Sequence, residues 1–242
     1  MTVAAQAQAL GSAAVSGRRS RTGADAARYN VLRRLAPALK HDMVVNLQAV
    51  AMMAEVLGAR LEKGSPKAGE FHSSVSKMNR LAREAVMTCL SVTAWIEPAE
   101  DESIRLRDGI DECVALLRSS LNFRGFSLDN QVPETEFEVS RVALRNLLAA
   151  SLISLTDAAQ EPCNVTIGAD ISSGFAVLTI RCVRREDEID GLMPDPFLRE
   201  LDWADVQALA LAEGVELFRT QDQIVMRIAR MVPSGPLQIA PH

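Results

Sequence analysis

The chain has 242 residues, enough for one large or two small domains, and 48% of them are hydrophobic while only 4% are aromatic, so we expect an aliphatic core. The formal net charge of −5 gives no sign of nucleic-acid binding, and no apolar run approaches the roughly 20 residues of a membrane span. The four cysteines form neither a CxxC pair nor a zinc-ligand spacing, which favours reduced thiols in a cytoplasmic protein.

The first 23 residues are rich in Ala, Gly, Ser and Gln. They lack the apolar segment and cleavage site of a signal peptide. We therefore expect residues 1–23 to be a disordered tail ahead of the first helix.

A long helix is predicted from about Gly23 to Arg60. Pro37 lies inside it and predicts a kink or a break, and the Gly64-Ser65-Pro66 segment predicts its end. Apolar residues recur every three or four positions and so share one stripe. The stripe consists of Leu32, Leu35, Leu39, Met43, Val50, Met53, Leu57 and Leu61.

His41 falls roughly opposite that stripe, at about 100° of rotation per residue, so its imidazole is predicted to face water. Asp42 follows it directly. An exposed imidazole beside a carboxylate can accept and return a phosphoryl group, and the alternative is an ordinary surface histidine. We assign no role to His72, near the start of the next helix.

A second long helix is predicted from about Lys67 to Ile96. Its apolar residues are spaced by alternating steps of four and three, which is a heptad seam. The seam consists of Phe71, Val75, Met78, Ala82, Ala85, Cys89, Val92 and Ile96. Two long helices joined by a short turn predict an antiparallel hairpin, and pairing two copies into a four-helix bundle would cover both stripes, which favours a homodimer.

The polar segment Pro98–Glu102 predicts a linker, after which strands and helices alternate. Strands are expected at 103–106, 126–132, 164–171, 175–183, 214–219 and 223–228, and helices at 108–121, 140–155 and 203–212, with Ser140 as an N-cap and a loop at 184–196. This order predicts an α/β sandwich with helices on one face of a mixed sheet.

A helical hairpin with an exposed His-acid pair, followed by this order of elements, resembles a bacterial sensor histidine kinase. The resemblance covers about Ala26 to Val232 and implies a dimerisation and phosphotransfer domain followed by an ATP-binding domain of the GHKL type. His41 matches the phosphoacceptor histidine, and Asp42 matches the acid that orients the imidazole and takes its proton. The family often has Thr or Asn at the position of Val45 and Pro at that of Asn46.

The ATP-binding motifs of the family are missing. Residues 145–150 align with the N-box, but Ala150 stands where an Asn should reach magnesium, and a methyl group is no ligand for a hard cation. After Val183 only Asp190-Gly191 remains of the DxGxG motif. The segment 201–206 contains carboxylates and no glycine where a phosphate-binding helix start should lie. The chain therefore resembles the dimeric histidine phosphotransferases that are built like degenerate sensor kinases.

The resemblance implies a phosphorelay protein in which His41 shuttles phosphate between receiver-domain aspartates, with Asp42 assisting. It implies no cofactor of its own, because the receiver supplies Mg²⁺. The expected partners are response-regulator receivers and a second copy of the chain, with a hybrid histidine kinase as a further candidate, and neither nucleic acid nor membrane. A non-catalytic adaptor or inhibitor that binds a kinase or receiver is the alternative, followed by an active ATP-dependent kinase.

The expected fold class is α+β, a helical hairpin followed by an α/β sandwich that resembles a histidine kinase ATP-binding domain. The expected domains are a disordered tail at 1–23, a phosphotransfer hairpin at 24–98, a degenerate GHKL-like domain at 99–233 and a C-terminal tail at 234–242.

Overall fold

The computed structural model describes residues 3–64, 68–93, 102–159, 161–184 and 201–231. The chain forms two compact units. We call residues 1–31 together with 99–242 the sheet unit, and residues 32–98 the helical unit. The predicted boundary at residue 24 therefore differs from the observed one at residue 32, because the first part of helix α1 belongs to the sheet unit. The predicted C-terminal tail and most of the predicted linker lie outside the described residues.

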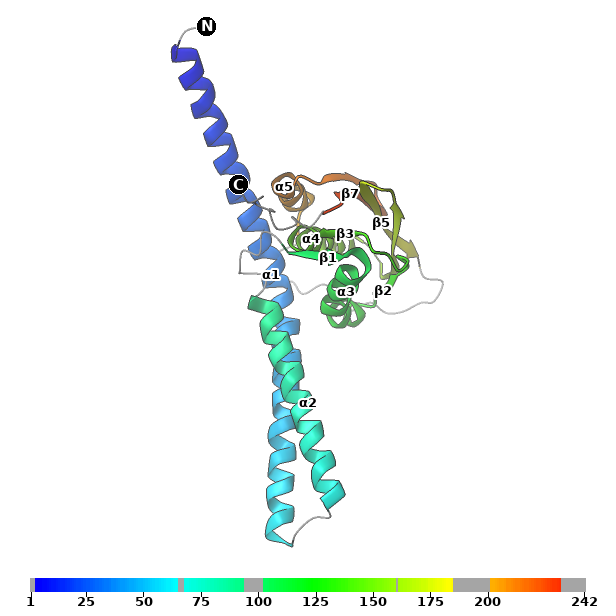
Figure 1. Ribbon diagram of the computed structural model, residues 1–242. Coiled ribbons are helices and arrows are strands. Elements are labelled where there is room, and N and C mark those ends of the chain that lie inside the picture. Colours follow the sequence, from blue (N-terminus) through cyan, green and yellow to red (C-terminus); the bar gives the residue numbers. More distant parts are fainter. Residues whose placement is uncertain (1–2, 65–67, 94–101, 160, 185–200, 232–242) are drawn as a thin grey trace, which may run out of the picture. The chain divides into compact units, whose positions relative to one another are not determined.

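Helix α1 (Val3–Glu62) is longer than predicted at its N-terminus, and its backbone is helical through most of the segment that we expected to be disordered (Figure 1). It continues through Pro37 without a break, although that residue has no N–H to donate. The backbone N–H of Gly64 bonds to the carbonyl of Leu61 at 3.3 Å just past the helix end, where a stop was predicted.

The helical unit consists of the second part of α1 and helix α2 (Ala68–Thr93), which is shorter than predicted within the described residues. Leu35, Leu39 and Leu57 of the predicted stripe are buried, but Leu61 is exposed. In α2, Ala85 is buried at 4% exposure, whereas Phe71 and Val75 of the predicted seam are exposed. The seam is thus only partly covered in a single copy.

The helix segment Thr22–Glu62 contains an 18-residue window with a mean hydropathy of 1.3, so it is long and apolar enough to cross a membrane by length and composition. The prediction that no apolar run approaches the length of a membrane span is therefore corrected for this helix. Asn46, Gln48 and Glu55 interrupt this segment, and polar and charged residues disfavour a place in the bilayer centre.

The sheet unit is built around a five-stranded mixed sheet with the order β2-β4-β5-β7-β6. Only β2 and β4 are parallel among these neighbours, and the other pairs are antiparallel. The strands are β2 (Ser127–Asn130), β4 (Cys163–Ile171), β5 (Phe175–Arg184), β6 (Glu216–Arg219) and β7 (Gln223–Ala229). Buried residues alternate along β4 and β5, as in a sheet with one face covered. The predicted strands are confirmed to within a few residues.

Three helices accompany this sheet, α3 (Leu106–Phe123), α4 (Arg141–Ala158) and α5 (Trp203–Glu213), and together they cover one of its faces (Figure 1). Helix α4 is the core, because most of its residues are buried, including Leu144, Leu147 and Leu148 at 0% exposure. Its predicted N-cap is confirmed, since the Ser140 hydroxyl accepts a hydrogen bond from the Ala143 N–H at 3.3 Å.

A separate two-stranded sheet pairs β1 (Ser103–Arg105) with β3 (Glu138–Ser140) in antiparallel register. Strand β1 was predicted and β3 was missed, because three residues are too few to show an alternating pattern. The mixed helix-and-sheet class is confirmed.

Candidate functional site

The candidate phosphotransfer residues lie on α1 within the helical unit. His41 is exposed, as predicted, and Asp42 is half-buried. Within the described part of the chain, neither side chain has a hydrogen bond or an ion pair. Both ring nitrogens of His41 are therefore uncommitted to the protein and can interact with an incoming group.

Exposed apolar residues surround His41 on the following turn of the helix. Val44 is 36% exposed and Val45 is 47% exposed, and these residues are three and four positions after His41, on the same side of α1. A valine cannot hydrogen-bond a water molecule. The surroundings of the imidazole are thus suited to contact with another protein surface rather than to the binding of a small polar substrate.

The N-box-like segment of α4 is largely buried. Ala150 and Ala149 are both 0% exposed, and Asn146 is 3% exposed. The apolar alanine side chains can be buried without a partner, but a buried amide group needs hydrogen-bond partners. The position that matches a magnesium-reaching Asn therefore holds a covered methyl group.

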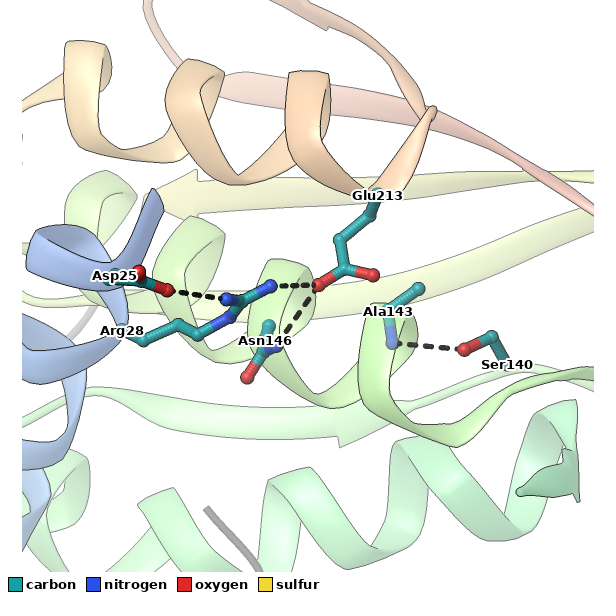
Figure 2. A network of polar contacts seen from close by, with 6 residues as sticks. All are labelled: Asp25, Arg28, Ser140, Ala143, Asn146 and Glu213. Carbon is teal, nitrogen blue, oxygen red and sulfur yellow. Dashed lines mark hydrogen bonds and ion pairs between the residues drawn. The ribbon is translucent and has the colours of Figure 1, made fainter. Parts of the chain in front are cut away.

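The partner of the Asn146 amide is Glu213, at the end of α5. The amide Nδ2 donates to Glu213 Oε1 at 3.3 Å, and Arg28 Nη2 donates to the same oxygen at 2.8 Å. Arg28 Nη1 also donates to Asp25 Oδ1 at 2.9 Å, so the four side chains form one network (Figure 2). Asn146 thus serves the internal packing of the sheet unit.

The network lies where the first part of α1 packs against α5. Ala24 and Ala27 of α1 are 1% and 0% exposed. A Cβ atom built on Gly23 would lie 3.7 Å from the Cβ of Ala208 in α5. Small side chains allow the two helices to approach closely, and Arg28 then reaches Glu213 across the contact.

The start of α5 is acidic, as the sequence suggested. Asp202 is the N-cap residue and its side chain makes no capping hydrogen bond, while Asp205 Oδ2 is buried without a hydrogen-bond partner among the described residues. Asp157 of α4 accepts a hydrogen bond from the Leu201 N–H at 3.3 Å and pairs with Arg124 at 3.0 Å. These carboxylates would repel a triphosphate at this helix start.

The N-box-like segment begins with a positively charged residue, Arg145. Arg145 is half-buried, and burial is the main cause that lowers its pKa. Among the residues that the structure describes, no group of three His, Cys, Asp or Glu side chains is placed to hold a metal ion. The segment with Asp190-Gly191, the remnant of the DxGxG motif, lies outside the described residues.

The sequence pattern singled out His41 and Asp42 as candidates, and it gave no sign of the network around Glu213. Asp25 and Arg28 are three residues apart, as in a helical ion pair, which is a weak local signal. Nothing local connects Arg28 to Glu213, which lies 185 residues further along the chain. Such a contact follows only from the packing of α1 on α5.

No family model matches the chain, and no curated protein matches it. Several solved structures are similar at low identity. The catalytic domain of the histidine kinase ThkA is 11% identical, with 55% of this chain and 98% of that chain covered and a TM-score of 0.41. The Acinetobacter baumannii histidine kinase AdeS is 15% identical, with 74% and 94% covered and a TM-score of 0.40. A bacterial phosphotransferase is 16% identical, with 83% and 96% covered and a TM-score of 0.36.

Proposed function

We propose that this protein is a histidine phosphotransferase of a bacterial two-component phosphorelay, and that His41 carries the phosphoryl group between receiver aspartates without ATP. The observation that carries the proposal is the exposed, uncommitted imidazole of His41 next to Asp42. The buried Ala150 and the engaged Asn146 support the absence of an ATP-dependent step.

In the proposed reaction, a ring nitrogen of His41 attacks the phosphorus of a receiver's aspartyl phosphate, in line with the departing carboxylate oxygen. The nitrogen–phosphorus bond forms as the phosphorus–oxygen bond to the aspartate breaks, and the receiver's Mg²⁺ holds the charge on the phosphoryl oxygens. Asp42 takes up or stabilises the proton of the imidazole. A second receiver reverses these steps and removes the phosphoryl group.

A homodimer through the helical unit is part of the proposal. In a single copy, many apolar side chains of α1 and α2 remain exposed, and a second copy would bury them in a four-helix bundle. The exposed residues away from the His41 side of α1 are Leu47 and Leu61, and those of α2 are Phe71, Val75, Val86, Met87 and Leu90.

We propose a cytoplasmic location, with receiver domains and a hybrid histidine kinase as partners and no nucleic acid or membrane. The hydropathy of Thr22–Glu62 makes location a necessary test. The protein should remain in the soluble fraction of lysed cells after ultracentrifugation. Its recovery in the membrane fraction, released only by detergent, would overturn this part of the proposal.

The direct test is phosphotransfer from a phosphorylated receiver of the same cell, read as acid-labile phosphate on this protein. His41→Gln keeps size and polarity but removes the nucleophile, so the label should vanish while receiver binding persists. His72→Gln is the matched control, because His72 is also an exposed helical histidine. Asp42→Asn should slow transfer by about 10²-fold or more, the usual contribution of a positioned acid–base group. Equal labelling of wild type and His41→Gln would refute the relay.

A non-catalytic adaptor is the second candidate, and the exposed Val44 and Val45 beside His41 favour it equally, because a docking surface needs no reactive group. It predicts receiver or kinase binding by the wild type with no phosphate on His41. An active kinase is tested by calorimetric titration with Mg-ATP, for which we expect no binding. A dissociation constant in the micromolar range would revive the kinase.

A further inference from the structure

Two cysteines of the sheet unit are diagonal neighbours on adjacent strands. In the antiparallel register of β4 and β5, Cys163 lies opposite Arg184 and Cys182 lies opposite Val165. Cross-strand partners share a face of the sheet, and residues two positions apart along a strand also share a face. Cys163 and Cys182 therefore project to the same side of the sheet.

The two thiols are in contact. The side-chain interaction between Cys163 and Cys182 lowers the pKa of Cys163 and raises the pKa of Cys182, while burial acts to raise both. The nearby Asp222 carboxylate also contributes to the raised pKa of Cys182. A sulfur with thiolate character is the nucleophile in thiol oxidation.

The pair lies at one end of the β4–β5 ladder. Cys163 is the first residue of β4, and the ladder between β5 and β7 ends at the Arg181–Gln223 pair, one residue before Cys182. Cys182 is accordingly half-buried, with its backbone N–H bonded to the Asp222 carbonyl at 2.8 Å. The Arg184 side chain, opposite Cys163, is 82% exposed and pairs with Glu161. Cys182 can therefore be reached from solvent, although Cys163 is itself buried.

We propose that Cys163 and Cys182 are a redox modification site, at which oxidants of the peroxide class produce a reversible disulfide between β4 and β5. The proposal is independent of the phosphotransfer function. It concerns a transient bond in a protein whose thiols are otherwise reduced.

The chemistry takes two steps. The thiolate of one cysteine of the pair attacks one peroxide oxygen, the oxygen–oxygen bond breaks, and the sulfenic acid of that cysteine forms as the second oxygen leaves and is protonated to water. The sulfur of the other cysteine then attacks the sulfenic sulfur, and the sulfur–sulfur bond forms. The hydroxyl group leaves with the proton of the second thiol as a second water. The two cysteines together lose two electrons, which the peroxide gains.

The two other cysteines provide internal controls. Cys89 of α2 is exposed and belongs to the helical unit, so it reports on simple accessibility. Cys113 of α3 is buried, and burial, assisted by the charge of Glu112, raises its pKa to about 12. Cys113 should therefore remain a protonated, unreactive thiol.

The test is oxidation of the folded, full-length protein with hydrogen peroxide, followed by alkylation of the remaining thiols, trypsin digestion and mass spectrometry. Trypsin separates the four cysteines, because it places Cys163 in the peptide 146–181 and Cys182 in the peptide 182–184. The expected product links these two peptides, with a mass about 2 Da below their sum for the two hydrogens lost. Dithiothreitol should restore both free peptides.

Cys163→Ser and Cys182→Ser should each abolish the linked product, and Cys89→Ser should leave its yield unchanged. Urea-denatured protein, in which all four cysteines compete, should give a lower yield of this pair than folded protein. The proposal is overturned if folded protein modifies Cys89 while Cys163 and Cys182 stay unlinked, or if the denatured protein links them equally well. Wild-type peptide mapping decides this even if a serine variant fails to fold.

Discussion

The sheet unit and the helical unit differ in where their apolar side chains lie. In the sheet unit, Leu144, Leu147 and Leu148 of α4 are 0% exposed. In the helical unit, Met52 is 61% exposed and Met87 is 65% exposed in a single copy. The sheet unit thus completes its core within one chain, whereas the helical unit presents apolar surface that another molecule can cover.

The two units also differ in how they use polar groups. In the sheet unit, Asn146 and Arg28 each donate a hydrogen bond to Glu213. The helical unit leaves His41 exposed and uncommitted. The polar side chains of the sheet unit are thus held by contacts within the chain, whereas His41 is open to an incoming molecule.

The largest effect is expected for Met78→Glu in the helical unit. Met78 lies in the predicted seam and is half-buried in one copy. A second copy would bury it fully, and an unpaired buried charge costs about 3–5 kcal/mol. The dimer should dissociate to monomers at micromolar concentration, as measured by light scattering. Lys77→Glu, at the exposed neighbouring position, should leave the dimer intact, and a wild-type monomer would refute the dimer itself.

A second test compares a leucine of the sheet unit with a valine of the helical unit. Leu147→Ala removes a fully buried side chain and should lower the free energy of unfolding by about 2–5 kcal/mol. Val86→Ala removes a side chain that is 57% exposed in one copy, so in a monomer it should cost about 0.5 kcal/mol or less. Thermal unfolding followed by circular dichroism measures both. A large cost for Val86→Ala would show that a partner covers it in solution.

A smaller effect is expected for Arg28→Ala in the network of the sheet unit. The ion pair with Glu213 measures 2.8 Å, with the two side chains 34% and 15% exposed. After allowance for solvent screening, its loss should cost about 1 kcal/mol. Asp25→Ala is the matched control, because Asp25 pairs with the same guanidinium but its side chain is 71% exposed. Equal costs for the two variants would mean that Glu213 and Asn146 do not depend on Arg28.

Much of the fold could be predicted because the relevant signals are local. The alternation along β4 and β5, the Ser140 cap and the apolar spacing in α4 each depend on residues a few positions apart. His41 was likewise found from its rotation relative to the stripe on its own helix. Such patterns arise from the geometry of a single element and need no knowledge of its neighbours.

The remaining features depend on contacts between distant segments. Gly23, the last residue of the stretch whose composition suggested a tail, lies close to Ala208 of α5. Strand β3 exists because it pairs with β1. The side-chain hydrogen bond from Ser103 to Glu138 joins residues of these two strands that are 35 positions apart in the chain. Tertiary partners decide these cases, and a single sequence does not name them.

The smallest effect is expected for Gly58→Ala at the surface of the helical unit. Gly58 lies inside α1, is exposed, and a Cβ built on it meets nothing within 4 Å. Alanine in a helix interior is favoured over glycine by about 0.5–1 kcal/mol, so the variant should unfold at a slightly higher temperature. Gly109→Ala is the contrasting control in the sheet unit, because its Cβ would lie 2.6 Å from Leu144 Cδ2 and should destabilise by overpacking. If Gly58→Ala is also destabilising, the space above Gly58 must be filled in solution by a second helix. The partner surface of the dimer would then run along this side of α1.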